Sequence, residues 1–144
     1  MHRCADAARE LGIRVNLVPY AADAPGKDFF ETPAINRKLI ETHHLSQNGR
    51  VRVWMGLEHL FYCSRDAYVN AKACSDEYGV RIHTHSSEQK EEVEAVIQHF
   101  GKRPIAVFKD YGILGEKTAI AHCVWLNDDE INMLADTGTS VAHC

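Results

Sequence analysis

Long apolar runs are missing from this 144-residue sequence, and no stretch reaches the roughly 18 apolar residues that predict a transmembrane helix. Residues 1–14 carry charges throughout and lack the apolar centre of a signal peptide. Basic residues are not in excess, because 16 Lys and Arg stand against 20 Asp and Glu. The formal net charge of −4 therefore gives no sign of a nucleic-acid-binding face, and no membrane partner is expected.

Cysteine pairs with metal-ligand or redox spacing are also missing, since no CxxC motif occurs. The sequence has five cysteines, at positions 4, 63, 74, 123 and 144. Their odd number leaves paired disulfides open but favours buried, reduced thiols in the core. Reduced thiols are typical of the cytoplasm, which is the expected location.

Apolar segments with two different periods alternate along the chain. Short β-rich runs predict strands over 13–19, 51–57, 80–85, 118–122 and 139–143. Amphipathic spacing and glycine stops predict helices over 2–11, 31–45, 65–78, 88–100, 104–111 and 128–136. Strands that alternate with helices indicate βαβ units and a parallel sheet, so we expect an α/β protein with no inner domain boundary.

Histidines end three of the predicted strands: His85 in IHTH, His122 in TAIAH and His143 in TSVAH. Chemistry gathers at the carboxyl ends of parallel strands, so three imidazoles at one rim indicate a metal or acid–base site. Glu88 follows the first of them and could reach the same rim at the carboxyl ends of the strands. A single strand-end histidine is more often only hydrogen-bonded, and Glu88 is equally typical of a helix start. Three further acidic residues read as a solvated helix face: Glu91, Glu92 and Glu94.

Several ordered motifs resemble the amidohydrolase superfamily. They are H-x-x-E at 85–88, AHCxxL at 121–126, and G-x-S-V-A-H-C at 138–144; GLEHLFYCS at 56–64 is similar to a further family segment. Within the superfamily the match is to the branch of guanine, adenosylhomocysteine and triazine deaminases and chlorohydrolases.

The resemblance implies a metal-dependent (β/α)8 barrel, a fold of about 250 residues. Residues 1–144 would supply a single partial barrel domain with strands three to seven and the intervening helices, as an internal fragment. The family's first-strand H-x-H is absent, because no HxH precedes residue 83, and its last-strand aspartate would lie beyond Cys144. Such a fragment is expected to be inactive and poorly folded alone, since its sheet edges are open.

The family's roles carry over onto matching positions. His85 resembles the fifth-strand metal ligand, with His83 one layer deeper, and Glu88 resembles the proton shuttle. His122 resembles the histidine that orients the attacking water in mononuclear members, although in dinuclear relatives it is a ligand. Glu58 and His59 lie where relatives place substrate-recognising side chains. His143 is expected to be structural or to lie behind the ligands.

The implied activity is hydrolysis of a non-peptide C–N bond, namely deamination of an aminated heterocycle by metal-bound hydroxide. The implied cofactor is one divalent metal ion, with zinc favoured over iron, and the partner is a small heterocyclic substrate. A homo-oligomer remains open. Two other classes also remain: an inactive module that binds a partner through the barrel rim, and a small metal-binding or ligand-binding protein. A dechlorinating, triazine-type hydrolase is the alternative inside the family.

Overall fold

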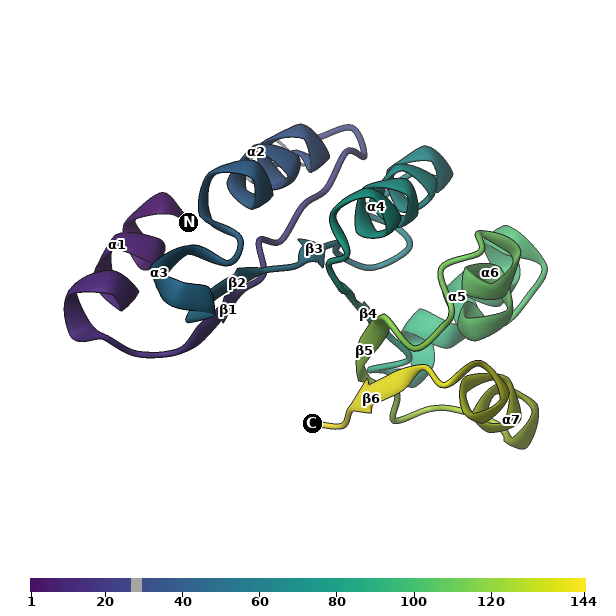
Figure 1. The fold of residues 1–144 in the computed structure, drawn as a ribbon. Coiled ribbons are helices and arrows are strands. Elements are labelled where there is room, and N and C mark those ends of the chain that lie inside the picture. The colour runs from purple at the N-terminus through teal and green to yellow at the C-terminus, as the bar shows by residue number, and fades with distance from the viewer. Residues whose placement is uncertain (27–29) are drawn as a thin grey trace.

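The computed structural model describes residues 1–26 and 30–144. Its helices are α1 (His2–Leu11), α2 (Pro33–His43), α3 (Ser46–Gly49), α4 (Arg65–Tyr78), α5 (Lys90–Phe100), α6 (Pro104–Asp110) and α7 (Asp128–Thr137). Its strands are β1 (Val15–Leu17), β2 (Val51–Val53), β3 (Met55–Gly56), β4 (Ile82–Ser86), β5 (Thr118–His122) and β6 (Ser140–Ala142). Strands and helices alternate along most of the chain, as the sequence predicts (Figure 1).

Local signals in the sequence place the helix ends. Ser64 caps α4 by accepting a hydrogen bond from the backbone N–H of Ala67, and Gly79 ends the helix in the left-handed conformation. Asn127 and Glu130 form a reciprocal capping box at the start of α7. These caps explain why the predicted bounds of α4 and α7 agree closely with the structure.

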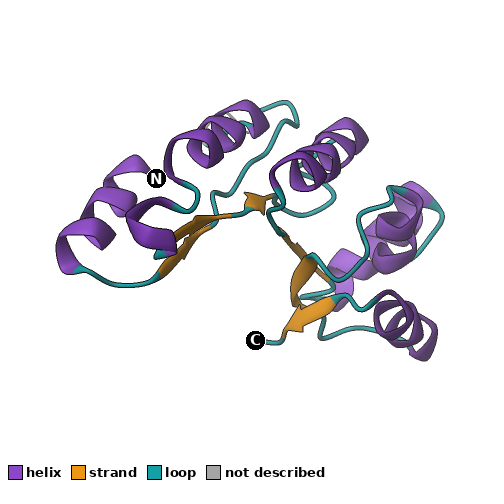
Figure 2. Ribbon diagram, in the orientation of Figure 1, coloured by secondary structure: helices purple, strands orange, loops and turns teal. Residues whose placement is uncertain are grey.

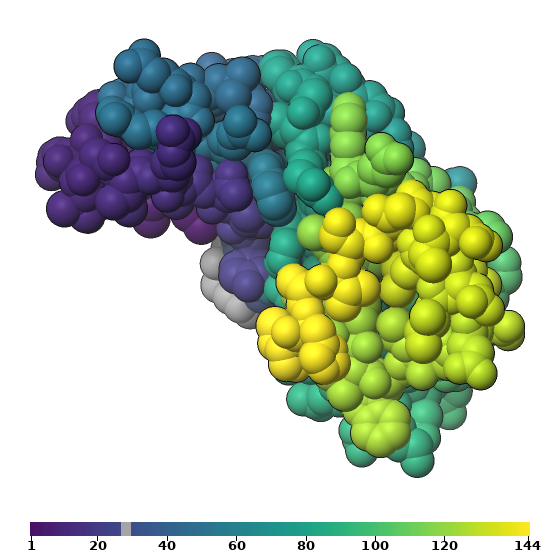
Figure 3. Space-filling view, turned by 60° about the horizontal axis from the view of Figure 1, so that its bottom comes forward, coloured from purple at the N-terminus to yellow at the C-terminus, as the bar shows by residue number. Residues whose placement is uncertain are grey.

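Every strand pair in the described residues is parallel. Strands β3, β4, β5 and β6 follow one another in one sheet, and β1 pairs with β2 in another. The α/β class and the parallel sheet are therefore confirmed. Figure 2 shows the strands along the inner side of an arc of helices, with the opposite side of the sheet left uncovered. In the space-filling view of Figure 3 the N-terminal and C-terminal residues lie on two arms of a bent chain. The strand order of the described residues closes no barrel.

The predicted strand over 51–57 is divided in the structure. Its first part, β2, pairs with β1, and its second part, β3, pairs with β4. Backbone hydrogen bonds continue across the break, because Trp54 N–H donates to the Leu17 carbonyl and Met55 N–H donates to the Arg81 carbonyl. Different parts of the one predicted strand thus pair with β1 and with β4, which hydrophobic periodicity alone does not reveal.

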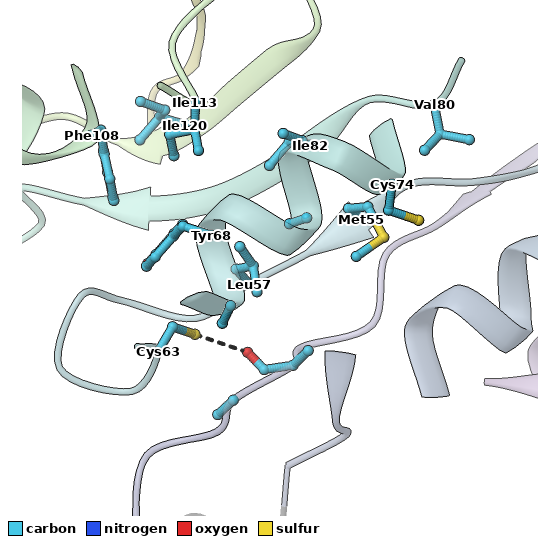
Figure 4. Packing of buried hydrophobic residues seen from close by; sticks show 14 of the residues in the cluster. Met55, Leu57, Cys63, Tyr68, Cys74, Val80, Ile82, Phe108, Ile113 and Ile120 are labelled. Atoms are coloured by element: carbon cyan, nitrogen blue, oxygen red, sulfur yellow. Dashed lines mark hydrogen bonds between the residues drawn. The ribbon is translucent and has the colours of Figure 1, made fainter. Parts of the chain in front are cut away.

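Apolar side chains fill the layer between the sheet and the helices. Figure 4 shows Leu57, Tyr68, Ile82 and Phe108 in this layer, and all four are fully buried. Burying an apolar side chain of this size contributes about 1.5–3 kcal/mol each. Tyr68 also donates a hydrogen bond from its hydroxyl to the carbonyl of Glu58 (2.7 Å), so the core directly supports the segment that follows β3.

The cysteines divide into two groups. Cys63, Cys74 and Cys123 are buried, and burial raises the pKa of the Cys63 and Cys123 thiols to about 12. Cys4 and Cys144 are exposed, so the expectation that all five lie in the core is wrong for these two. All five thiols are free.

None of the described helices is both long enough and apolar enough to cross a membrane.

Candidate active site

The carboxyl ends of three neighbouring strands bring the predicted site residues together. In β4 and β5 the register pairs His85 with Ala121 and Ser86 with His122. Strand β3 lies on the other side of β4, with Gly56 opposite His83, and Glu58 and His59 follow it directly. Segments that are far apart in sequence therefore deliver their polar side chains to one edge of the sheet.

Two carboxylates lie among three imidazoles at this edge. His59 Nδ1 is 2.9 Å from Glu58 Oε2, and His85 Nδ1 is 4.0 Å from the same oxygen. On the other side Glu88 Oε2 is 3.6 Å from His59 Nε2 and 3.7 Å from His122 Nε2. The Glu88 carboxylate thus faces the histidines and does not cap α5, whose N-cap is Gln89.

His85 is the most enclosed member of the cluster. Only 6% of it is exposed, and its Nδ1 is buried without a hydrogen-bond partner. Burial lowers the pKa of His85 to about 4, although the nearby Glu58 carboxylate acts in the opposite direction. His85 is therefore a neutral imidazole at neutral pH with a free ring nitrogen, which is the form that binds metal ions.

Ligand atoms of three residues lie within 4.8 Å of one another: Glu58, His59 and His85. Nitrogen and carboxylate oxygen donors suit zinc and related divalent ions. The residues present thus fit a divalent cation at His85. They also place Glu58 and His59, which the sequence assigns to the substrate, within reach of the same ion.

The turns that follow β4 and β5 are strained. Ser87, His122 and Cys123 have positive φ angles of 56°, 72° and 55°, which non-glycine residues rarely adopt. The turns hold each other, because Cys123 N–H donates to the Ser86 carbonyl (2.9 Å) and Val124 N–H donates to the Ser87 carbonyl (3.0 Å). These turns carry His122 and Glu88, whose Nε2 and Oε2 atoms lie 3.7 Å apart.

Glu92 fixes the turn that carries Glu88. Its carboxylate accepts hydrogen bonds from the backbone N–H groups of Ser87 (3.0 Å) and Glu88 (2.8 Å). The interpretation of Glu92 as part of a solvated face is wrong, since the side chain bends back over the first turn of α5. Helical spacing places Glu92 among surface acids, and only the tertiary fold shows which backbone groups it binds.

Two further rings contact His85. Tyr20, in the segment after β1, stacks on it with ring centroids 5.0 Å apart, and His83 meets it edge-on at 5.3 Å. His83 Nδ1 is also buried without a partner, and burial lowers the pKa of His83. The HxH motif marks His83, whereas no sequence signal marks Tyr20.

His143 stands apart from the cluster described above. Its Nδ1 lies 3.0 Å from the backbone oxygen of His122, and the residue is exposed. The supporting role expected for His143 stays a prediction.

Comparison with known proteins gives consistent results. The chain is 32% identical over 143 residues to a 5'-deoxyadenosine deaminase of Methanopyrus kandleri, covering 99% of this chain and 33% of that protein. It is 41% identical over 97 residues to a 5-methylthioadenosine/S-adenosylhomocysteine deaminase of Symbiobacterium thermophilum, covering 67% and 22%. The chain thus spans about a third or less of these relatives.

Solved structures share the fold. An adenosine deaminase from Xanthomonas campestris with bound zinc superposes with a TM-score of 0.86 at 19% identity, over 97% of this chain and 32% of that one. A guanine deaminase from C. acetobutylicum with bound guanine gives 0.86 at 19% identity, over 99% and 36%. The family model described as "Amidohydrolase family" matches residues 1–144. The chain therefore belongs to the amidohydrolase family.

Proposed function

We propose that this chain forms strands three to seven of a (β/α)8 barrel whose complete protein hydrolytically deaminates an aminated heterocycle. The observation that carries the proposal is the convergence of His85, Glu88 and His122 at the carboxyl ends of adjacent parallel strands. This end of a (β/α)8 barrel holds the active site in such enzymes. Deaminase relatives at 32–41% identity support the reaction class.

His85 is proposed to hold a divalent metal ion, with zinc as the first choice. Its buried, unpartnered Nδ1 and its lowered pKa support this role. A bound divalent ion supplies an activated water, because coordination lowers the pKa of water from about 15.7 toward about 7. The remaining ligands are proposed to come from an H-x-H on the first strand and an aspartate on the last strand, neither of which lies within residues 1–144.

Glu88 is proposed to carry the protons. Its carboxylate lies at the open side of the cluster, 3.7 Å from His122 Nε2, where both groups can contact the attacking water and the substrate ring. The oxygen of water bonds to the ring carbon, the bond to the amino group breaks, and ammonia leaves. Glu88 protonates the ring nitrogen and then the leaving nitrogen with protons taken from water. His122 orients the water or stabilises the negative charge that develops on its oxygen.

Glu58 and His59 are proposed to recognise the substrate. Their mutual contact of 2.9 Å fixes both side chains, and the His59 ring stacks on His85 at 5.2 Å between centroids. A substrate held by this pair lies directly against the proposed metal position. Adenosine derivatives modified at the 5' position are the first substrates to test, since the relatives named above are deaminases of such compounds.

The experiment is to recover the complete reading frame, express its product with zinc, and assay ammonia release. The substrate panel contains 5'-deoxyadenosine, methylthioadenosine, S-adenosylhomocysteine, guanine and an aminotriazine. An H-x-H upstream, an aspartate downstream and ammonia release support the proposal. Chloride release from a chlorotriazine without ammonia would indicate the dechlorinating alternative. A frame that lacks both ligand motifs, with no turnover, would indicate a binding module instead.

A further inference from the structure

A basic cavity lies at the opposite ends of the strands from the histidine cluster. It has a volume of about 620 Å³ and opens among the segments that precede β1, β2 and β4. Four arginines line it: Arg14, Arg50, Arg52 and Arg81. Trp54 and Asn16 also line it, and none of its described lining residues is acidic.

Strand geometry places part of this lining on the uncovered face of the sheet. Side chains alternate along a strand, so Arg52 and Trp54 share a face, and the β1–β2 register puts Asn16 opposite Arg52. Arg81 directly precedes β4 and lies over the ring of Trp54, with 5.4 Å between its guanidinium carbon and the ring centroid. His83 and His85 alternate with Arg81 on this same face, farther along β4.

The guanidinium of Arg81 is only partly satisfied. Its Nη2 donates to the Glu116 carbonyl (2.9 Å) and to Ser140 Oγ (3.2 Å), while its Nε is buried and has no partner. Both acceptors are neutral. Three other arginines contact carboxylates in the described chain: Arg9, Arg37 and Arg103. By contrast, none of the four cavity arginines forms an ion pair within 4.0 Å with the side-chain carboxylate of a described Asp or Glu, and the Glu116 contact of Arg81 is to a backbone carbonyl.

Closing the barrel would raise the free-energy cost of leaving these arginine charges unpaired. The inside of a closed (β/α)8 barrel is a packed core without a pore, so the face that carries Arg52 and Arg81 would lose most of its water. A charged group in such a place is strongly unfavourable unless an opposite charge and hydrogen bonds compensate it. The compensating acid is absent from residues 1–26 and 30–144 around this cavity.

We propose that strands of this protein outside residues 1–144 place at least one Asp or Glu carboxylate against Arg81, and that this ion pair joins the two parts of the barrel at its amino end. The inference rests on the proposed barrel but concerns the end away from the reaction. Guanidinium groups prefer contact with a carboxylate, and the hydrogen bonds that Arg81 makes to described residues all run through Nη2 and to neutral acceptors, which leaves its positive charge without an opposite charge. A small dianion such as phosphate has the same chemistry and is the competing occupant.

The first test reads the flanking sequence of the complete protein. We expect an acidic residue near the amino end of a flanking strand, at a position whose side chain faces the inside of the barrel. If the flanks carry the H-x-H and the last-strand aspartate but no acidic residue at such a position, the ion pair is refuted while the proposed function stands. If the flanks carry neither ligand motif, the barrel itself is wrong.

The second test compares thermal unfolding of the complete protein with Arg81→Met, Arg81→Lys and Arg50→Met. Arg81→Met should lower the Tm by about 5 °C or more, because it leaves a buried carboxylate unpaired. Arg81→Lys should recover part of the loss, and Arg50→Met is the control for removing a positive charge at the cavity. Changing the acidic partner to its amide together with Arg81→Met should cost less than the sum of the single changes.

Inorganic phosphate separates the two occupants. We expect the Tm of the wild-type protein to rise equally with phosphate and with chloride at matched ionic strength. A larger rise with phosphate that disappears in Arg81→Met would overturn the proposal in favour of an anion site. An Arg81→Met protein with a wild-type Tm would also overturn it. Should Arg81→Met not fold, the milder Arg81→Lys and the amide variant of the acidic partner still test the coupling.

Discussion

The two ends of the sheet differ in charge and in strain. At the carboxyl ends two glutamates face three histidines, and three non-glycine residues with positive φ hold the turns. At the amino ends four arginines line a cavity without an acidic neighbour in the described chain. Strand β4 connects the two ends, since Arg81 directly precedes it and His85 lies four residues later, about 13 Å away at about 3.3 Å per residue.

This difference suggests that the carboxyl ends carry the reaction and that the amino ends join the parts of the barrel. At the carboxyl ends an imidazole nitrogen and a carboxylate oxygen lie within 4.0 Å of each other, and the buried Nδ1 atoms of His83 and His85 have no hydrogen-bond partner. The four arginines at the amino ends form no ion pair with a carboxylate in the described residues. We therefore expect substitutions at the carboxyl ends to change metal content and rate, and Arg81 substitutions to change stability.

The largest effect is expected for His85→Ala in the complete protein. It removes a buried ligand nitrogen, so metal and activity should be lost together. Elemental analysis beside kcat measures both, and His99→Ala is the matched control because that exposed histidine only packs against Phe61 and Phe100. Full zinc content in His85→Ala would show that the ligand assignment is wrong.

Glu88→Gln should lower kcat by about 10²–10⁴-fold and leave the metal bound, because the amide keeps the size but cannot transfer protons. Glu91→Gln, on the exposed face of α5, serves as control and should keep the wild-type rate. If Glu88→Gln runs at the wild-type rate, Glu88 is only a residue at a strand-to-helix turn.

His122→Ala should lower kcat by about 10²–10³-fold, which is the usual effect of removing one group that stabilises a developing oxyanion. Retained metal would indicate a mononuclear site, in which His122 contacts water or substrate. Loss of metal with activity would place His122 among the ligands of a dinuclear site. Metal content therefore decides between the two family arrangements, and an unchanged rate would remove His122 from the site.

Glu92→Ala should have the smallest of these effects, a fall in kcat of about 10-fold. The substitution removes the carboxylate that accepts charge-assisted hydrogen bonds from the backbone N–H groups of Ser87 and Glu88. These two bonds hold the turn that orients Glu88. Metal content should not change, and Glu92→Gln should lie between Ala and wild type because it keeps one carbonyl acceptor. A pH profile of kcat separates positioning from general destabilisation, since misplacing Glu88 shifts the profile while simple loss of folded protein only scales it.

Much of the local structure could be predicted from the residues themselves. Gly79, Gly101 and Gly138 end helices where a left-handed residue is needed, and the apolar runs before His85 and His122 mark buried parallel strands. Parallel strands with histidines at their last positions also predict that the imidazoles meet, which is confirmed for His85 and His122. These signals are local, so a short stretch of sequence contains them.

Other features depend on contacts between distant segments, and only the tertiary structure decides them. The strand over 51–57 divides because different parts of it pair with β1 and β4, and Gly56 is required because a side-chain carbon there would lie 1.9 Å from the Pro19 carbonyl oxygen. Tyr20 stacks on His85, and Glu92 binds the turn before its own helix, although neither has a spacing that signals it. The sequence by itself determined the helices, the strands and the reactive residues at the strand ends, because helix caps, strand periods and residue types are local properties. The tertiary structure decided which of them meet and which charges remain unpaired, because packing between strands fixes both.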